Sequence, residues 1–151
     1  MELSLLFDSN RTGHNDLFLR FAGQIYICDS YYLALDGELM PDIEKGSEVR
    51  VSLRRLLEQW YSAIETVPEG GSVYLPYDFS DQYTAWLHCT RSGDTVTIVH
   101  GHTDLEGWSI SPSALGQHMF RLPRFQPNGP PVQTLISDLI EGIRKSMAQN
   151  A

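Results

Sequence analysis

Residues 100–104 read His-Gly-His-Thr-Asp, which is a spacing that can bring metal ligands together. At the end of a strand, this pattern can point two imidazoles and a carboxylate at one divalent cation, and zinc takes such ligands at about 2.0–2.2 Å. His100, His102 and Asp104 are therefore candidate metal ligands, and they could serve a small metal-dependent hydrolase. The competing and favoured interpretation is structural, with His100 ending a strand and His102 exposed in a turn.

The same five residues resemble the start of the metal motif of metallo-β-lactamases. That motif continues with His directly after the Asp, whereas Leu105 stands at this position here. The family fold is also larger and needs further downstream His and Asp ligands, for which this chain has no matching positions. The resemblance leaves a metal centre as an alternative only, and we expect no cofactor.

Two other groupings could carry chemistry. Asp78 and Asp81, with Ser80 between them, could act as general acid and base or ligate a hard cation, but loop Asp and Ser residues routinely cap their own backbone amides. His88 and Cys89 are adjacent, and on a strand their side chains point to opposite faces, which argues against a Cys–His dyad. The hydrolase, phosphate-loop and dinucleotide signatures GxSxG, GxxxxGK[ST] and GxGxxG do not occur in the sequence.

The central part of the chain combines aromatic and acidic residues in a pattern typical of a protein-binding surface. Rigid aromatic side chains serve as anchors in interfaces, and carboxylates around them favour a basic partner. The alternative is that most of the aromatic residues belong to the core. The candidate partner-binding residues are Asp78, Phe79, Asp81, Tyr83, Asp104, Glu106 and Trp108.

Charge supports this interpretation. The 151 residues include 11 Lys and Arg against 19 Asp and Glu, a formal net charge of −8 at pH 7. A negative field repels phosphate backbones and attracts cationic surfaces, although acidity can also serve solubility alone. We therefore expect a basic protein partner and no nucleic acid.

Three segments resemble those of a set of small, acidic, largely uncharacterised bacterial proteins. They are DFSDQYT at residues 78–84, Gly-Asp at 93–94 and GWSISPS at 107–113. Such single domains are similar in size and charge to immunity proteins of bacterial toxin systems. The resemblance implies partner binding, but it assigns no role to any particular residue.

The elements that must position these residues follow from periodicity. Apolar residues recur at helical spacing in 52–66 and 132–147, while β-rich runs separated by turn residues indicate strands. The expected strands are 2–8, 17–29 with a bend at Gly23, 31–35, 73–77, 83–90 and 94–100, with an acidic loop at 38–47 and a helical turn within 113–120. These elements predict one α+β domain over residues 1–151, in which two amphipathic helices pack on one face of an antiparallel β-sheet.

The hairpin of strands 83–90 and 94–100 has a consequence for the site. Antiparallel pairing places the start of the first strand beside the end of the second, so the loops 78–83 and 104–108 should lie side by side.

Cysteine usage and hydropathy indicate where the protein works. Cys28 and Cys89 lie in apolar runs without a CxxC pair, so we expect both to be buried and reduced. The first residues lack a basic region followed by an apolar stretch, and no run of about 18 apolar residues occurs. These features predict a cytoplasmic protein that is not in a membrane.

Three functional hypotheses follow. The first is a non-enzymatic acidic protein-binding domain, similar to an immunity protein, that neutralises a basic partner. The second is the metal-dependent hydrolase that would use residues 100–104. The third is a subunit or scaffold of a larger assembly, which an exposed apolar patch would favour.

Overall fold

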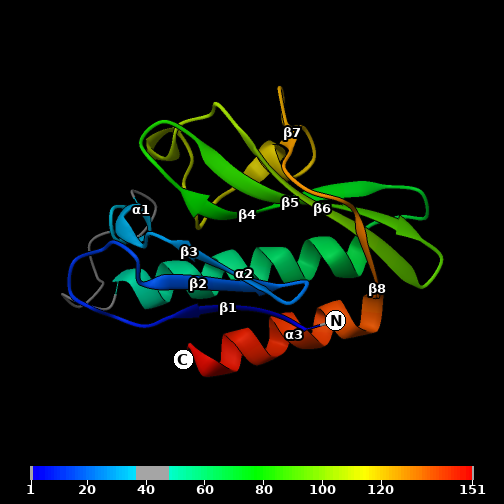
Figure 1. Ribbon diagram of the computed structural model, residues 1–151, viewed down its shortest axis with the longest axis horizontal. Helices are drawn as coiled ribbons and strands as arrows, with labels where there is room; N and C mark the ends of the chain where they lie inside the picture. Colours follow the sequence, from blue (N-terminus) through cyan, green and yellow to red (C-terminus); the bar gives the residue numbers. More distant parts are fainter. Residues whose placement is uncertain (1, 37–47, 151) are drawn as a thin grey trace.

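The computed structural model describes residues 2–36 and 48–150 (Figure 1). Its strands form two antiparallel sheets, and its main helices are α2, Glu48–Thr66, and α3, Ile136–Gln149. The expected α+β class is confirmed, but the strands divide between two sheets where one had been expected. The expected acidic loop 38–47 lies outside the described residues.

The first sheet has the order β1-β2-β3, with strands Leu3–Phe7, Leu17–Phe21 and Gln24–Cys28. The single bent strand expected over 17–29 is wrong, because the chain reverses at Ala22 and Gly23 and makes β2 and β3 a hairpin. Both turn residues have positive φ, 53° and 77°. Two successive positive φ values fit a tight hairpin turn whose twist matches the strands.

The strand expected over 31–35 is also wrong, since Tyr31–Ala34 forms the short helix α1. The carboxylate of Asp16 accepts hydrogen bonds from the backbone N–H and the hydroxyl of Ser30, at 3.0 and 2.7 Å. The carbonyl of Ser30 then accepts the N–H groups of Leu33 and Ala34. The buried carboxylate of Asp16, the residue just before β2, thus anchors the turn into α1, so these contacts override the β propensity of the Tyr-Tyr-Leu run.

Helix α2 confirms the predicted apolar stripe. The side chains of Leu53, Leu56, Leu57, Trp60 and Ile64 are fully buried. The helix begins four residues before Ser52, whose hydroxyl donates to Asp36 at 3.0 Å instead of capping the helix. The indole N–H of Trp60 donates to the carbonyl of Pro76 at 3.1 Å, so α2 packs against the second sheet.

The second sheet has the order β4-β5-β6-β7, and β8 also pairs with β6. The predicted hairpin within residues 83–100 is confirmed as the pair β5 and β6, and a 3-10 turn, η2, occurs within the predicted segment 113–120. The bounds are β4 Ser72–Phe79, β5 Thr84–Ser92, β6 Thr95–Thr103, β7 Gln126–Pro127, β8 Val132–Leu135, η1 Gly107–Ser109 and η2 Gly116–Met119.

The predicted helix 132–147 begins later than expected. Its first four residues form strand β8, which pairs with β6 from Thr95 opposite Leu135 to Ile98 opposite Val132. The backbone N–H of Ile136 then donates to the carbonyl of Asp94 at 2.8 Å, where the strand becomes helix α3. The edge of β6 offers ladder hydrogen bonds that the local helical pattern could not reveal.

The layers are clearest in Figure 1, where α2 crosses the molecule between the second sheet and α3. Helix α3 packs against α2 and β1, and α1 contacts the first part of α2. The two helices therefore do not share one sheet face as expected, because α2 covers β4 while α3 lies along β1. No helix within residues 2–36 and 48–150 is long and apolar enough to cross a membrane.

Candidate functional site: a loop face and an adjoining cleft

The two loops that the hairpin was expected to bring together do lie side by side. The backbone N–H of Gly107 donates to the carbonyl of Ser80 at 2.7 Å. A Cβ atom at position 107 would lie 2.7 Å from the same carbonyl oxygen, so a larger residue cannot be accommodated there without a backbone shift. The surface formed by residues 80–83 and 104–109, together with Tyr32, is called the loop face below.

The loop face presents two aromatic side chains and two carboxylates. Trp108 is 65% exposed and Tyr83 is 41% exposed. The indole N–H of Trp108 donates to the carboxylate of Glu106. Asp81 and Glu106 are both exposed, so this edge carries negative charge beside a large apolar ring.

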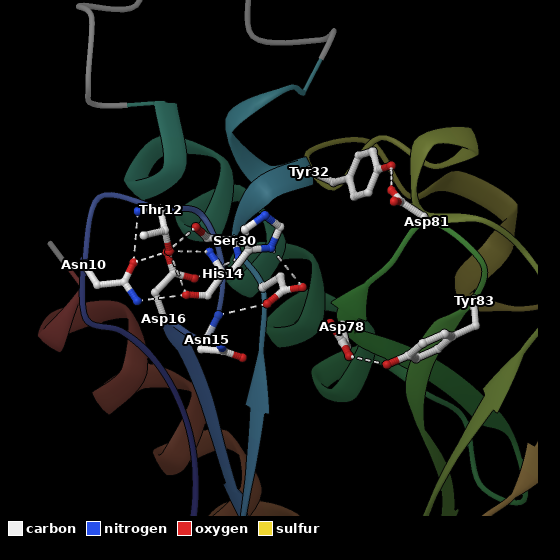
Figure 2. Close-up of polar contacts among 11 residues, drawn as sticks. Asn10, Thr12, His14, Asn15, Asp16, Ser30, Tyr32, Asp78, Asp81 and Tyr83 are labelled. Carbon is white, nitrogen blue, oxygen red and sulfur yellow. Dashed lines mark hydrogen bonds and ion pairs between the residues drawn. The ribbon is translucent and has the colours of Figure 1, made fainter.

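Tyr32 of α1 joins the loop face and was missed by sequence analysis, because its segment was expected to be a strand. Its hydroxyl donates to the carboxylate of Asp81 (Figure 2). That hydrogen bond, assisted by the charges of Asp81 and Glu106, raises the pKa of Tyr32 to about 12. The neutral phenol thus holds Asp81 in place as a hydrogen-bond acceptor.

Two of the expected partner-binding residues are not available as expected. Phe79 is only 1% exposed, because it ends β4 with its ring in the core, so it cannot be an interface anchor. Asp104 accepts hydrogen bonds from Nε and Nη2 of Arg124, at 2.8 to 2.9 Å. This guanidinium lowers the pKa of Asp104 and balances its charge. Asp81 and Glu106 are thus the acids of the loop face that form no ion pair with a described residue.

Asp78 lies in a different place from the other acids. It belongs to β4 and faces a cleft of about 710 Å3 between the two sheets. The cleft is lined by Ile25, Tyr26, Ile27, Cys28, Tyr77, Asp78, Tyr83, Ala85, His100, His102 and Asn128. Tyr83 belongs to both the loop face and the cleft, and therefore marks their border.

The environment of Asp78 disfavours its ionised form. Burial raises the pKa of this carboxyl from 3.8 to about 6, although hydrogen bonds from the hydroxyl of Tyr83 and from the backbone of Asp29 oppose the shift. The Tyr83 hydroxyl donates at 3.2 Å, and the charge of Asp78 raises the pKa of Tyr83 to about 12. A carboxyl group that titrates near neutral pH can exchange protons or bind cations.

The two histidines and the aspartate of the HxHxD string do not converge. His100 Nε2 lies 3.3 Å from the Tyr26 hydroxyl, and burial lowers the pKa of its ring. His102 Nδ1 forms a hydrogen bond with Asn128 at 2.7 Å, while Asp104 is held by Arg124. Within the described parts of the chain, no three His, Cys, Asp or Glu side chains are grouped so that they could hold a metal ion.

The remaining groupings do not form reactive pairs either. Asp78 and Asp81 are held by different tyrosines and point to different partners (Figure 2). Cys89 is 1% exposed, and His88 stacks on Tyr74 with ring centroids 4.4 Å apart. Neither an acid–base pair nor a Cys–His dyad is assembled from these residues.

Comparison with known proteins adds no relative: no family model, curated protein or solved structure matches this chain.

Proposed function

We propose that this protein is a non-enzymatic acidic binding domain, immunity-like in character, that engages a basic protein through the loop face. The observation that carries the proposal is Trp108, a large aromatic side chain that is 65% exposed beside the carboxylates of Asp81 and Glu106. Trp side chains often carry a large share of the binding free energy of a protein interface, particularly where the partner excludes water from the ring. The resemblance to small acidic bacterial proteins points the same way.

The proposed mechanism has an electrostatic step and a packing step. The net charge of −8 attracts a cationic surface over several ångströms and orients it toward the loop face. Contact then buries the rings of Trp108 and Tyr83, while Asp81 and Glu106 pair with Lys or Arg of the partner. Phosphate-rich nucleic acid is disfavoured by the same field. The proposal places the chain in the cytoplasm, where a reducing environment keeps thiols such as Cys28 and Cys89 free.

The experiment is affinity capture from cells that produce the protein, followed by binding kinetics with the purified partner. Capture by the wild type should yield a basic protein that Trp108→Ala no longer retains. Asp81→Lys combined with Glu106→Lys should slow association and flatten its salt dependence, because steering is lost. Trp108→Ala should mainly speed dissociation, since it removes a short-range contact.

Matched controls use exposed residues away from the loop face. Glu58→Lys combined with Glu65→Lys changes the net charge by the same amount on α2, and Phe120→Ala removes another exposed ring. The charge reversal on α2 should slow association less than the one on the loop face, and Phe120→Ala should leave the dissociation rate unchanged. A partner whose binding is insensitive to both the charge reversal and the Trp108 substitution would defeat the proposal.

A second candidate, a subunit of a larger assembly, is supported by one observation. Ile25 and Ile27 on β3 are 56% and 59% exposed, and with Leu6 and Phe18 they line an apolar depression on the outer face of the first sheet. Sedimentation of the wild type and of Ile27→Lys tests this possibility. A monomer at all concentrations and no captured partner sensitive to Ile27→Lys would rule it out.

A further inference from the structure

Aromatic rings enclose one carboxylate in the cleft between the two sheets. Tyr26 of β3 and Tyr77 of β4 have ring centroids 6.2 Å apart, with planes inclined by 52°. Tyr83 is the residue just before β5, and its hydroxyl donates to Asp78 at 3.2 Å. The three rings therefore come from one strand of each sheet and from the loop before β5, and Asp78 lines the same cleft.

A β-bulge is responsible for this arrangement. Pro76 pairs with Trp86 and Asp78 pairs with Ala85, so Tyr77 is an extra residue without a partner on β5. Successive residues of a regular strand face opposite sides, but a bulge re-aims them, and both Tyr77 and Asp78 line the cleft. The small side chain of Ala85 opposite Asp78 leaves the space open.

Among the described residues, no Lys or Arg lies beside the Asp78 carboxylate in the cleft. The described residues that line the cleft include neither Lys nor Arg. The charged and titratable groups around the carboxyl are Asp29, Cys28, Tyr77 and Tyr83, with the half-buried His100 and His102 on β6. The carboxylate of Asp29 is itself engaged, since it accepts the backbone N–H of Asn15 at 2.9 Å and lies 3.3 Å from His14 Nδ1.

We propose that this cleft binds an organic cation, an alkylammonium group that pairs with the Asp78 carboxylate and is surrounded by the rings of Tyr26, Tyr77 and Tyr83. Aromatic faces carry negative electrostatic potential and attract such cations, most strongly where water is excluded. The group could belong to a free amine or to a lysine side chain of a protein. The inference rests on the cleft alone and does not depend on a role for the loop face.

Other ligand classes fit the cleft less well. A bare divalent metal would need several carboxylate or imidazole ligands, whereas one carboxylate faces the cleft and no group of three ligands occurs among the described residues. An anion would meet the charge of Asp78 without a Lys or Arg to balance it. A neutral apolar molecule would cover the half-buried carboxylate of Asp78 without supplying a counter-charge.

The test is a pair of NMR titrations of the full chain with choline and with its neutral isostere 3,3-dimethylbutan-1-ol. We expect choline to shift the resonances of Tyr26, Tyr77 and Tyr83 with a millimolar dissociation constant, and the alcohol to bind at least about tenfold more weakly. A third titration, with Nα-acetyl-lysine methylamide, distinguishes the two sources. Tighter binding of choline indicates a free quaternary amine, and tighter binding of the lysine derivative indicates a protein side chain.

Variants test whether choline binding depends on Asp78 and on the tyrosine rings of the cleft. Asp78→Asn should weaken choline binding by at least about tenfold, and Tyr83→Phe should weaken it less, because the ring remains. Asp94→Asn, at the exposed turn between β5 and β6, removes an equal charge away from the cleft and should have no effect. Binding by the wild type should also fall as pH drops through about 6, where Asp78 becomes protonated.

Three results would overturn the inference: equal binding of choline and the alcohol, binding unchanged in Asp78→Asn, or no shift of the cleft tyrosines by any of the cationic probes. If Asp78→Asn did not fold, Tyr83→Phe and the pH profile would decide the same question. Capture of a partner by the loop face would be unaffected by such a failure, since Trp108 and Glu106 lie outside the cleft.

Discussion

At the scale of single residues, the position of Asp78 determines how it titrates. As a loop residue it would be solvated and ionised above about pH 4. In the cleft, burial raises its pKa to about 6, while the similar residue Asp81 accepts a hydrogen bond from Tyr32 at the surface. Two acids three positions apart therefore have different roles, because one faces the gap between the sheets and the other faces solvent.

Asp78 should make the stability of the fold depend on pH. Its pKa is higher in the folded state than the usual 3.8, so the folded protein holds the proton more tightly. This contribution to stability is therefore fully present below about pH 4, falls as pH rises to about 6 and is absent above that. The free energy of unfolding of the wild type, relative to Asp78→Asn, should drop by about 2–3 kcal/mol between pH 4 and 7. Urea melts at several pH values measure this difference, and a flat or rising difference would contradict the assigned environment.

The two thiols should be unreactive in the folded protein. Cys28 and Cys89 are 3% and 1% exposed, and burial raises the pKa of both well above its usual range. Thiolate is the reactive form, so a disulfide reagent at neutral pH should label neither thiol until the chain unfolds. Labelling in urea provides the positive control. Rapid modification of either cysteine without denaturant would show that the core around that cysteine opens in the folded protein.

At the scale of elements, burial along the helices differs from what periodicity alone indicates. Leu56 of α2 and Ile143 of α3 are fully buried, whereas Ile136, at the first position of α3, is only partly buried. Leu56→Ala and Ile143→Ala should each reduce the free energy of unfolding by about 2–5 kcal/mol. Ile136→Ala should reduce the free energy of unfolding by less than either of these two substitutions. Urea melts of the three variants test this order, and an equal or larger loss at Ile136 would contradict it.

Helix α3 can approach β1 closely because position 142 is a glycine. A Cβ atom on Gly142 would lie 2.5 Å from the carbonyl oxygen of Leu3, so the helix would have to shift away from the strand. Gly142→Ala should therefore destabilise the fold by about 1–3 kcal/mol, although alanine is the better helix former. Ser137→Ala, exposed on the same helix, should have little effect. A stabilised Gly142→Ala variant would show that the contact is looser than described.

At the scale of the whole molecule, the two ends of the chain close the fold together. Strand β1 pairs with β2 on one side, and side chains of α3 and of its C-cap residue Asn150 form hydrogen bonds with its other edge. The backbone N–H of Leu5 donates to the hydroxyl of Ser146 at 3.0 Å, and that of Phe7 donates to the Asn150 amide oxygen at 2.9 Å. The Asn150 amide N–H donates in turn to the carbonyl of Leu5 at 2.8 Å. An edge covered in this way is protected from pairing with other chains.

Asn150→Ala should therefore lower the free energy of unfolding, although residue 150 lies next to the last residue of the sequence. It leaves an N–H and a carbonyl of β1 without partners, and such unsatisfied groups cost about 1–3 kcal/mol. Gln149→Ala, exposed one position earlier, should change stability by less than about 0.5 kcal/mol. Thermal or urea unfolding compares the two variants. Equal effects would show that the Asn150 amide does not hold β1.

The sequence by itself determined the features that arise from local patterns. The helical period of Leu53, Leu56 and Leu57 specified α2, and alternation with a Gly93 turn specified the β5–β6 hairpin. Antiparallel pairing then required the loops around Ser80 and Gly107 to meet. These inferences succeed because the period of a helix or strand and the geometry of a hairpin depend on neighbouring residues.

Only the tertiary structure decided what each candidate side chain faces. The ion pair of Asp104 with Arg124, the burial of Phe79 and the enclosure of Asp78 depend on segments distant in the chain or on the bulge at Tyr77. The same is true of β8, which a helical pattern concealed until it paired with β6. Burial and counter-charge are properties of the three-dimensional surroundings. A linear pattern therefore predicts which residues can bind or titrate, while the packed fold determines which of them do.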